Sequence, residues 1–139
     1  MRIDSSEMCR LQVSRSPAAL ASATSSLGTL LNKNLIGARN ALVAISLGAM
    51  TSAVLSAGVY ECATSGGTYT LVSGSAFSVT AASQNKIFVG SVNLEGRLQF
   101  LKIRHRAGTG GAPIVGSSWL LCNPPALAIS QENTVKFQV

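Results

Sequence analysis

The chain has 139 residues and a net charge of +6, with 12% of its residues charged and 47% hydrophobic. This length supplies one hydrophobic core and argues against a second one. One Trp, two Tyr and four Phe disfavour a surface that stacks on bases or sugars. Because globular domains carry about 25% charged residues, much of the surface must be Ser, Thr and Gly or be covered by another molecule.

The first predicted strand covers residues 8–13, where side chains alternate across the strand. One side carries Met8, Arg10 and Gln12, and the other carries Cys9, Leu11 and Val13. This alternation predicts a half-buried strand. Residues 14–34 are rich in Ser and Ala and contain Pro17, so we expect an extended arm or a long loop there.

We predict a strand-rich core over residues 40–122, because Gly, Pro and Asn repeatedly separate short apolar runs there. Turn-forming residues predict a hairpin turn at 64–67 and a tight turn at 93–96. They also predict the loop of another hairpin at 108–113. The predicted strands are 41–47, 54–62, 68–72, 86–92, 97–106 and 114–122, with 74–80 ambiguous.

Residues 123–139 form a predicted C-terminal tail, which two prolines separate from the preceding strand and which ends in a last strand over 134–139. Seven to nine short strands without a helix repeat predict one all-β domain over 1–139, an antiparallel β-sandwich or jelly roll. We expect the arm 14–34 and the tail 126–139 to become ordered on docking.

Residues 41–60 carry no charge and are as long as a membrane helix. Several Ser, Thr and Gly residues dilute their hydrophobicity, with a natural break at 48–52, so two strands joined by a turn explain this stretch better. The N-terminal ten residues contain no apolar run typical of a secretory signal. We therefore expect no membrane partner.

The three cysteines, Cys9, Cys62 and Cys122, are far apart and have no partners at metal-ligand spacing. We expect them to be free, buried, small apolar residues of a protein made in a reducing cytoplasm. No metal and no cofactor are expected.

The most distinctive stretch is the basic strand over 97–106. Its alternation predicts that three cations share one face and three apolar or aromatic residues share the other. The first set is Lys102, Arg104 and Arg106, and the second is Leu101, Ile103 and His105. A row of cations can meet a partner's carboxylates or phosphates, or it can be a solvated face whose charge prevents edge aggregation.

Catalysis has no positive support in the sequence. His105 is the only histidine and Asp4 the only aspartate, so a Ser-His-Asp triad would need Asp4 from the terminal arm. His105 is expected to be packed beside Leu101 and Ile103. The glycines at 108–111 lack the Lys-Ser/Thr of a phosphate loop, and Trp119 is expected in the core or at an interface.

The order of several short motifs resembles that of small virion proteins of tailed bacteriophages, of the head decoration or capsid cement type. The matching stretches are Met1-Arg-Ile3 with Cys9-Arg10, the strand 41–49, Val59-Tyr-Glu-Cys62 before the 65–69 turn, and the basic strand 97–106. The chain departs from this pattern at 17–34 and after Pro124.

This resemblance implies a non-enzymatic β-sandwich that is assembled in the host cytoplasm and located on the capsid exterior of a virion. It implies that the protein bridges neighbouring major capsid proteins and forms dimers or trimers with itself. The candidate interface residues are Lys102, Arg104, Arg106, Arg10 and Trp119. The alternatives are a host-surface or carbohydrate-binding module on the virion and a basic virion protein that contacts DNA, with nucleic acid the less favoured partner.

Overall fold

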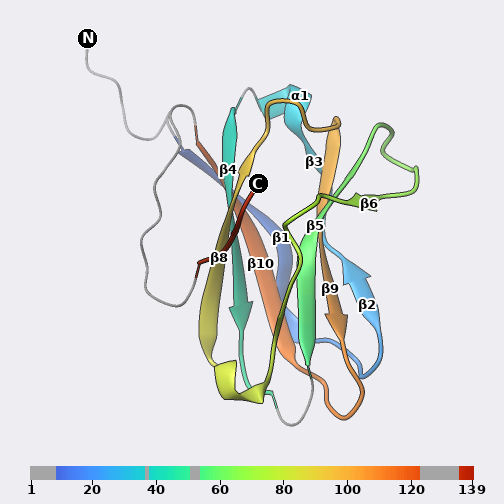
Figure 1. Ribbon diagram of the computed structural model, residues 1–139, viewed down its shortest axis with the longest axis vertical. Helices are drawn as coiled ribbons and strands as arrows, with labels where there is room; N and C mark the ends of the chain where they lie inside the picture. Colours follow the sequence, from blue (N-terminus) through green and yellow to red (C-terminus); the bar gives the residue numbers. More distant parts are fainter. Residues whose placement is uncertain (1–8, 37, 51–53, 123–134) are drawn as a thin grey trace.

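The computed structural model describes residues 9–36, 38–50, 54–122 and 135–139. Two β-sheets face each other in this part of the chain and enclose one hydrophobic core (Figure 1). The predicted β-sandwich is confirmed.

The elements follow one another in the chain almost entirely as strands. They are β1 (Cys9–Ala19), β2 (Ser25–Leu27), β3 (Leu31–Asn32), the short helix α1 (Lys33–Ile36), β4 (Asn40–Leu47), β5 (Leu55–Cys62), β6 (Thr70–Leu71), β7 (Phe77–Val79), the 3-10 turn η2 (Ala81–Ser83), β8 (Lys86–Asn93), β9 (Phe100–Ala107), β10 (Ile114–Cys122) and β11 (Val135–Gln138).

The five-stranded sheet has the order β1-β10-β4-β8-β11, and the six-stranded sheet has the order β2-β9-β5-β6, with β3 on β9 and β7 on β5. β11 lies parallel to β8, whereas the other pairings are antiparallel. β11 agrees with the strand predicted over 134–139. The first part of the predicted tail, 123–134, lies outside the described residues.

Alternation along each long strand builds the core, because every second side chain of a strand points to the same face. In β4 the residues Ala41, Val43, Ile45 and Leu47 are buried, while the residues between them are half-buried. The largest fully buried side chains come from both sheets and include Trp119, Ile45, Leu55, Leu101 and Ile103. Burying each large apolar side chain contributes about 1.5–3 kcal/mol.

The predicted arm 14–34 is not an arm in this structure. β1 continues to Ala19, and its register against β10 shifts on both sides of Arg15. β1 is an edge strand, and edges and bulges are where a sheet tolerates proline, so Pro17 does not end it. The shifts also break the period of two, which explains why the sequence pattern does not show this extension.

The rest of this segment closes one side of the sandwich. β2 and β3 both pair with β9, and the chain next to them is joined to β1. Thr29 donates its N–H to the Ser14 carbonyl at 2.7 Å, and the Gln12 amide donates to the Leu30 carbonyl at 3.1 Å. Gly28 lies so close to Ser14 that a Cβ there would overlap the Ser14 hydroxyl.

The hairpin predicted around 64–67 is confirmed, because β5 and β6 pair antiparallel with Tyr60 opposite Leu71. The hairpin predicted between the strands now called β9 and β10 is wrong, since these strands belong to different sheets. The connection at 93–96 likewise leads from β8 in one sheet to β9 in the other, and Gly96 has the positive φ of 77° that suits glycine.

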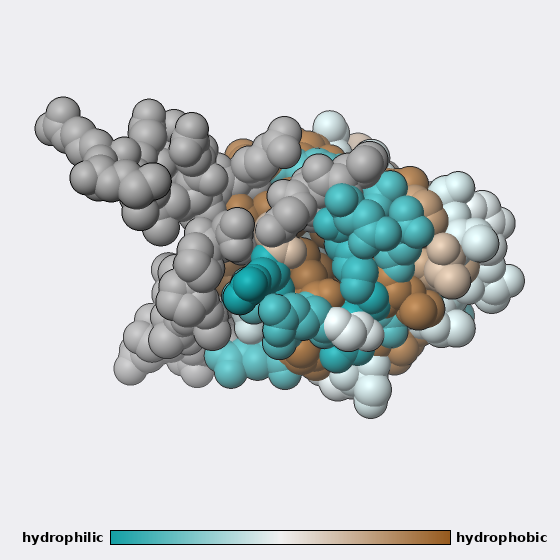
Figure 2. All heavy atoms as spheres, turned by 90° about the horizontal axis from the view of Figure 1, so that it is seen from above, coloured by the Kyte–Doolittle hydropathy of each residue, from teal (hydrophilic) through white to brown (hydrophobic). Residues whose placement is uncertain are grey.

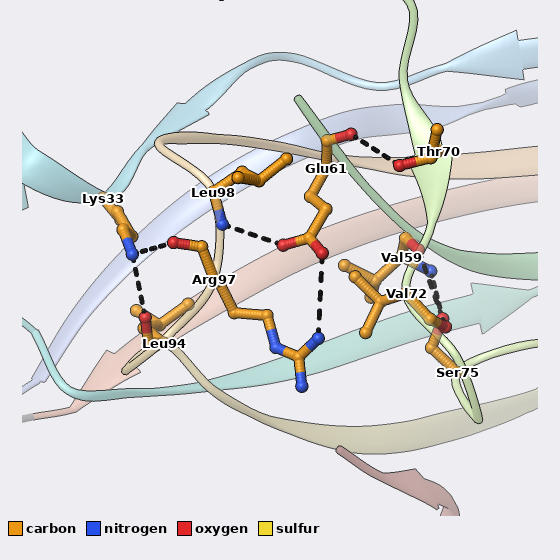
Figure 3. Close-up of polar contacts among 9 residues, drawn as sticks. All are labelled: Lys33, Val59, Glu61, Thr70, Val72, Ser75, Leu94, Arg97 and Leu98. Atoms are coloured by element: carbon orange, nitrogen blue, oxygen red, sulfur yellow. Dashed lines mark hydrogen bonds and ion pairs between the residues drawn. The ribbon is translucent and has the colours of Figure 1, made fainter. Parts of the chain in front are cut away.

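Ser75 completes the edge of β5 at a place where no strand pairs with it in the described chain. β6 covers Tyr60 and Glu61, and β7 covers residues 55–57. Between them the buried Ser75 hydroxyl accepts a hydrogen bond from the Val59 N–H at 3.0 Å and donates to the Val72 carbonyl at 2.8 Å (Figure 3). A side chain thus replaces a missing strand partner.

A polar cluster ties α1 to the connection between β8 and β9 (Figure 3). The Lys33 ammonium donates to the carbonyls of Leu94 and Arg97. The Glu61 carboxylate accepts the Leu98 N–H at 2.9 Å and lies 3.8 Å from the Arg97 guanidinium. These contacts fix the chain where it crosses from one sheet to the other.

Replacing Gly90 with Ala is expected to destabilise the protein by about 1–3 kcal/mol, because a Cβ would overlap the Phe137 ring of β11. Urea unfolding followed by fluorescence of the single Trp measures this change. Gly66→Ala is the matched control, since a Cβ at Gly66 meets no atom within 4 Å. In a Phe137→Ala background the cost of Gly90→Ala should vanish; an unchanged cost there would contradict the proposed overlap.

Ser75→Ala is expected to cost about 1–3 kcal/mol of unfolding free energy, because it leaves the buried Val59 N–H without its acceptor. The exposed Ser73 provides the control: Ser73→Ala should stay within about 0.5 kcal/mol of the unchanged protein. Equal effects of the two substitutions would show that the Ser75 hydroxyl does not support β5.

Candidate functional site

The basic strand lies in the middle of the six-stranded sheet and divides its residues as predicted. In β9, Leu101, Ile103 and His105 are fully buried. Lys102 and Arg104 are half-buried and Arg106 is exposed, so these three cations share the outer face of the sheet. The face that they occupy is the first candidate interaction surface.

Two tyrosines lie beside these cations. The Lys102 ammonium lies 4.6 Å from the centroid of the Tyr69 ring, and the Arg104 guanidinium lies 5.3 Å from that of Tyr60. Both distances are typical of cation–π contacts. The rings that could have stacked on a sugar therefore contact cations of the same chain.

His105 is packed in the core beneath this face. Burial lowers the pKa of His105 to about 4, the nearby Arg15 guanidinium lowers it as well, and the Ser26 backbone acts in the opposite direction. The imidazole is therefore neutral at neutral pH. Its position agrees with the prediction that His105 is packed beside apolar neighbours.

Two other predicted interface residues, Arg10 and Trp119, belong to strands of the five-stranded sheet. Trp119 lies in β10, in the five-stranded sheet, and its side chain is fully buried. It is therefore a core residue and not one of the exposed candidate interface residues. Its apolar neighbours fit both places equally well, so the sequence could not separate core from interface. Arg10 lies in β1, where its backbone pairs with Leu121 of β10, and its side chain lies outside the described residues. Cys62 is free and buried, as expected.

The outer face of the five-stranded sheet is chemically the opposite of the basic face. Three large apolar side chains stand out from it: Leu11 is 70% exposed, Val13 54% and Ile87 58%. The register aligns them with uncharged neighbours across β10, β4 and β8. These neighbours are Leu42, Ala44, Ser46, Val89, Ser91, Ser118 and Leu120. We call this surface, with Leu11, Val13 and Ile87 at its centre, the neutral face.

The neutral face inverts the usual orientation of an amphipathic strand. In β1 the apolar Leu11 and Val13 are exposed, while Gln12 is half-buried and Ser14 is buried. The sequence pattern does not single out Leu11, Val13 or Ile87 as interface residues. Alternation shows that two residues share a side but does not show which side faces the core.

The charged residues near the β8–β9 connection lie at one end of the sandwich. Arg39 and Glu95 form an exposed ion pair at 3.7 Å, and Lys33, Glu61 and Arg97 form the cluster described above. Figure 2 looks onto this end and shows hydrophilic side chains with apolar residues between them. Most charged side chains of the described chain lie at this end and on the basic face, whereas Arg15 borders the neutral face beside Leu11 and Val13.

No group of three His, Cys, Asp or Glu side chains that could hold a metal ion occurs among the described residues. Within that same part of the chain, no helix has the length and apolar character needed to cross a membrane.

The sequence matches no protein-family model and no curated protein. Two solved structures share the fold. The exported protein XepA of the phage PBSX aligns with a TM-score of 0.63 and 9% identity over 89% of this chain. The chain spans 41% of XepA. A structure of Bacillus endospore appendages, described as disulfide-linked pili, aligns with a TM-score of 0.51 and 10% identity over 85% of this chain and 90% of the other.

The buried His105 predicts a pH dependence of stability. Its pKa falls from about 6.5 when unfolded to about 4 when folded. The unfolded chain therefore binds the proton first, so this contribution is complete above about pH 6.5 and is lost as the pH falls towards 4. We expect a loss of about 2 kcal/mol between about pH 7.5 and about pH 5.

Urea unfolding at the two pH values measures this loss, and His105→Gln should remove most of it. NMR titration gives a separate test, because the single imidazole has its own ring-proton signals. A titration midpoint near 6.5 in the folded protein would contradict the lowered pKa.

Proposed function

We propose that this protein is a non-enzymatic structural subunit of a phage-associated or pilus-like assembly, and that its neutral face packs against a neighbouring subunit. The exposed Leu11, Val13 and Ile87 carry this proposal. A contiguous apolar surface is typical of interaction sites. Its lack of charge matters as well, because interface cores are depleted in charged residues.

The composition supports the same proposal. The chain has a net charge of +6, and chains of like charge repel one another. A surface without charges can be covered without burying an ion, which avoids the large desolvation cost of a buried charge. A chain that has much of one face covered by a neighbour needs few charged residues there, and this accounts for the low charge content.

The more specific proposal is that the assembly is a bacteriophage head and that the neutral face contacts the major capsid protein. The resemblance of the sequence motifs to head decoration proteins supports it, and a phage exported protein has the same fold. Contacts repeated over many copies stabilise a shell through avidity without a tight individual site. On this proposal the protein is located on a virion, and an extracellular appendage is the alternative location.

The neutral face can be tested with charge substitutions. Val13→Lys and Ile87→Lys should each weaken association with the assembled particle by about tenfold or more, because each buries an unpaired cation in the contact. Leu98→Lys is the matched control, since Leu98 is 43% exposed and lies in the β8–β9 connection. Cosedimentation with particles measures retention, and circular dichroism checks the fold. Equal retention of all three variants would contradict a contact through this face.

The capsid assignment needs a separate experiment. Washed virions from the producing cells should contain the chain at a fixed ratio to the major capsid protein, and heads without it should rupture at a lower temperature. Quantitative mass spectrometry of the particles measures the ratio. Absence of the chain from washed virions would exclude the decoration role, whereas its presence in purified filaments would support the pilus-like alternative.

A further inference from the structure

The basic face contains a depression of about 280 Å³ at the end of β9, next to β5 and β7. Arg104 and Arg106 lie on one side of it, and Ser56 and Ser78 lie on the other. Gly58 lies opposite Arg104 in the register. It has no side chain to fill the space between the arginines and the serines. The depression is separate from the neutral face, which belongs to the other sheet.

The two arginines have no carboxylate partner in the described chain. The described acidic residues, Glu61 and Glu95, pair with Arg97 and Arg39 at the end of the sandwich. Arg104 is nevertheless held in place, since its guanidinium contacts the Tyr60 ring and donates one hydrogen bond to the Ser25 hydroxyl at 3.3 Å. A guanidinium has five N–H donors, so most of those of Arg104 remain available.

Hydroxyl groups complete the set of donors. The Ser56 and Ser78 hydroxyls lie 3.0 Å apart and hydrogen-bond to each other. Only one of the two protons is used in that bond, so the other hydroxyl can donate to a ligand. Two arginines and two serines thus line one depression.

We propose that this depression binds a phosphate or sulfate group, as found in a monoester of a small compound. Planar guanidinium groups bind phosphate oxygens with two parallel hydrogen bonds, and a tetrahedral oxyanion accepts hydrogen bonds in several directions at once. The volume lies near the lower end of the range for small-molecule sites, so the ligand is small. This site is independent of the neutral face and of the proposed assembly.

Isothermal titration calorimetry with inorganic phosphate, sulfate and glycerol 3-phosphate, at constant ionic strength, tests the proposal. We expect millimolar binding of at least one of these anions. Arg104→Gln and Arg106→Gln should each weaken it by about tenfold. Lys102→Gln is the matched control, because it removes the same charge from the same strand and face but from outside the depression. Lys102→Gln should change the affinity for the anion less than twofold.

Two further experiments distinguish a specific anion site from general electrostatic attraction to the basic face. Arg104→Lys keeps the charge but loses the planar fork, so it should also weaken binding. A single-stranded oligothymidylate tests the nucleic-acid alternative. No binding of the three anions, equal losses in the Lys102 and arginine variants, or oligonucleotide binding that needs Lys102 as much as the arginines would overturn the proposal.

Discussion

The molecule depends on direct apolar contact between the inner faces of its two sheets. Trp119 and Ile45 come from the five-stranded sheet, Val59 and Ile103 come from the six-stranded sheet, and all four side chains are almost completely buried. Sheets that pack face to face interdigitate their side chains in a layer about 10 Å thick. Since this layer fixes the inward residues of every long strand, it also fixes which residues face outwards.

The outward residues are where the two sheets differ. One sheet presents Lys102, Arg104 and Arg106, and the other presents the neutral face centred on Leu11, Val13 and Ile87. The same core therefore supports two chemically different outer surfaces: a neutral one, which we propose packs against a neighbouring subunit, and a basic one, which we propose binds a small anion. The low charge content of the chain agrees with this division, since the described core contains no Lys, Arg, Asp or Glu and Arg15 is the charged residue that borders the neutral face.

The sequence predicted the long strands well and their partners poorly. Short apolar runs bounded by turn residues identified the strands that are now β4, β5, β8, β9 and β10, because each of these strands has eight or nine residues. β2 and β3 have only three and two residues, which is too short for a period to be recognised. The prediction wrongly joined β9 and β10 in a hairpin, because a local sequence pattern does not tell which sheet a strand enters.

The candidate site shows the same limit. The cations of β9 were predicted because charge at every second position is visible in a sequence. The contribution of Ser56 and Ser78 depends on the pairing of β5 with β7, and the exposure of Leu11 depends on which side of β1 faces the core. Both are properties of the tertiary structure. Local patterns thus identified the chemistry of single strands but not the surfaces that neighbouring strands build together.

The parallel strand β11 has a consequence for how the protein is made. It is the outermost strand of its sheet, and its Phe137 ring lies over Gly90 of β8. During synthesis the edge of β8 has no partner on that side until residues 135–138 leave the ribosome, which happens after every other described strand is available. An unpaired strand edge is a template for aggregation. A chaperone that covers the edge of β8 would therefore protect the nascent chain until β11 has been made.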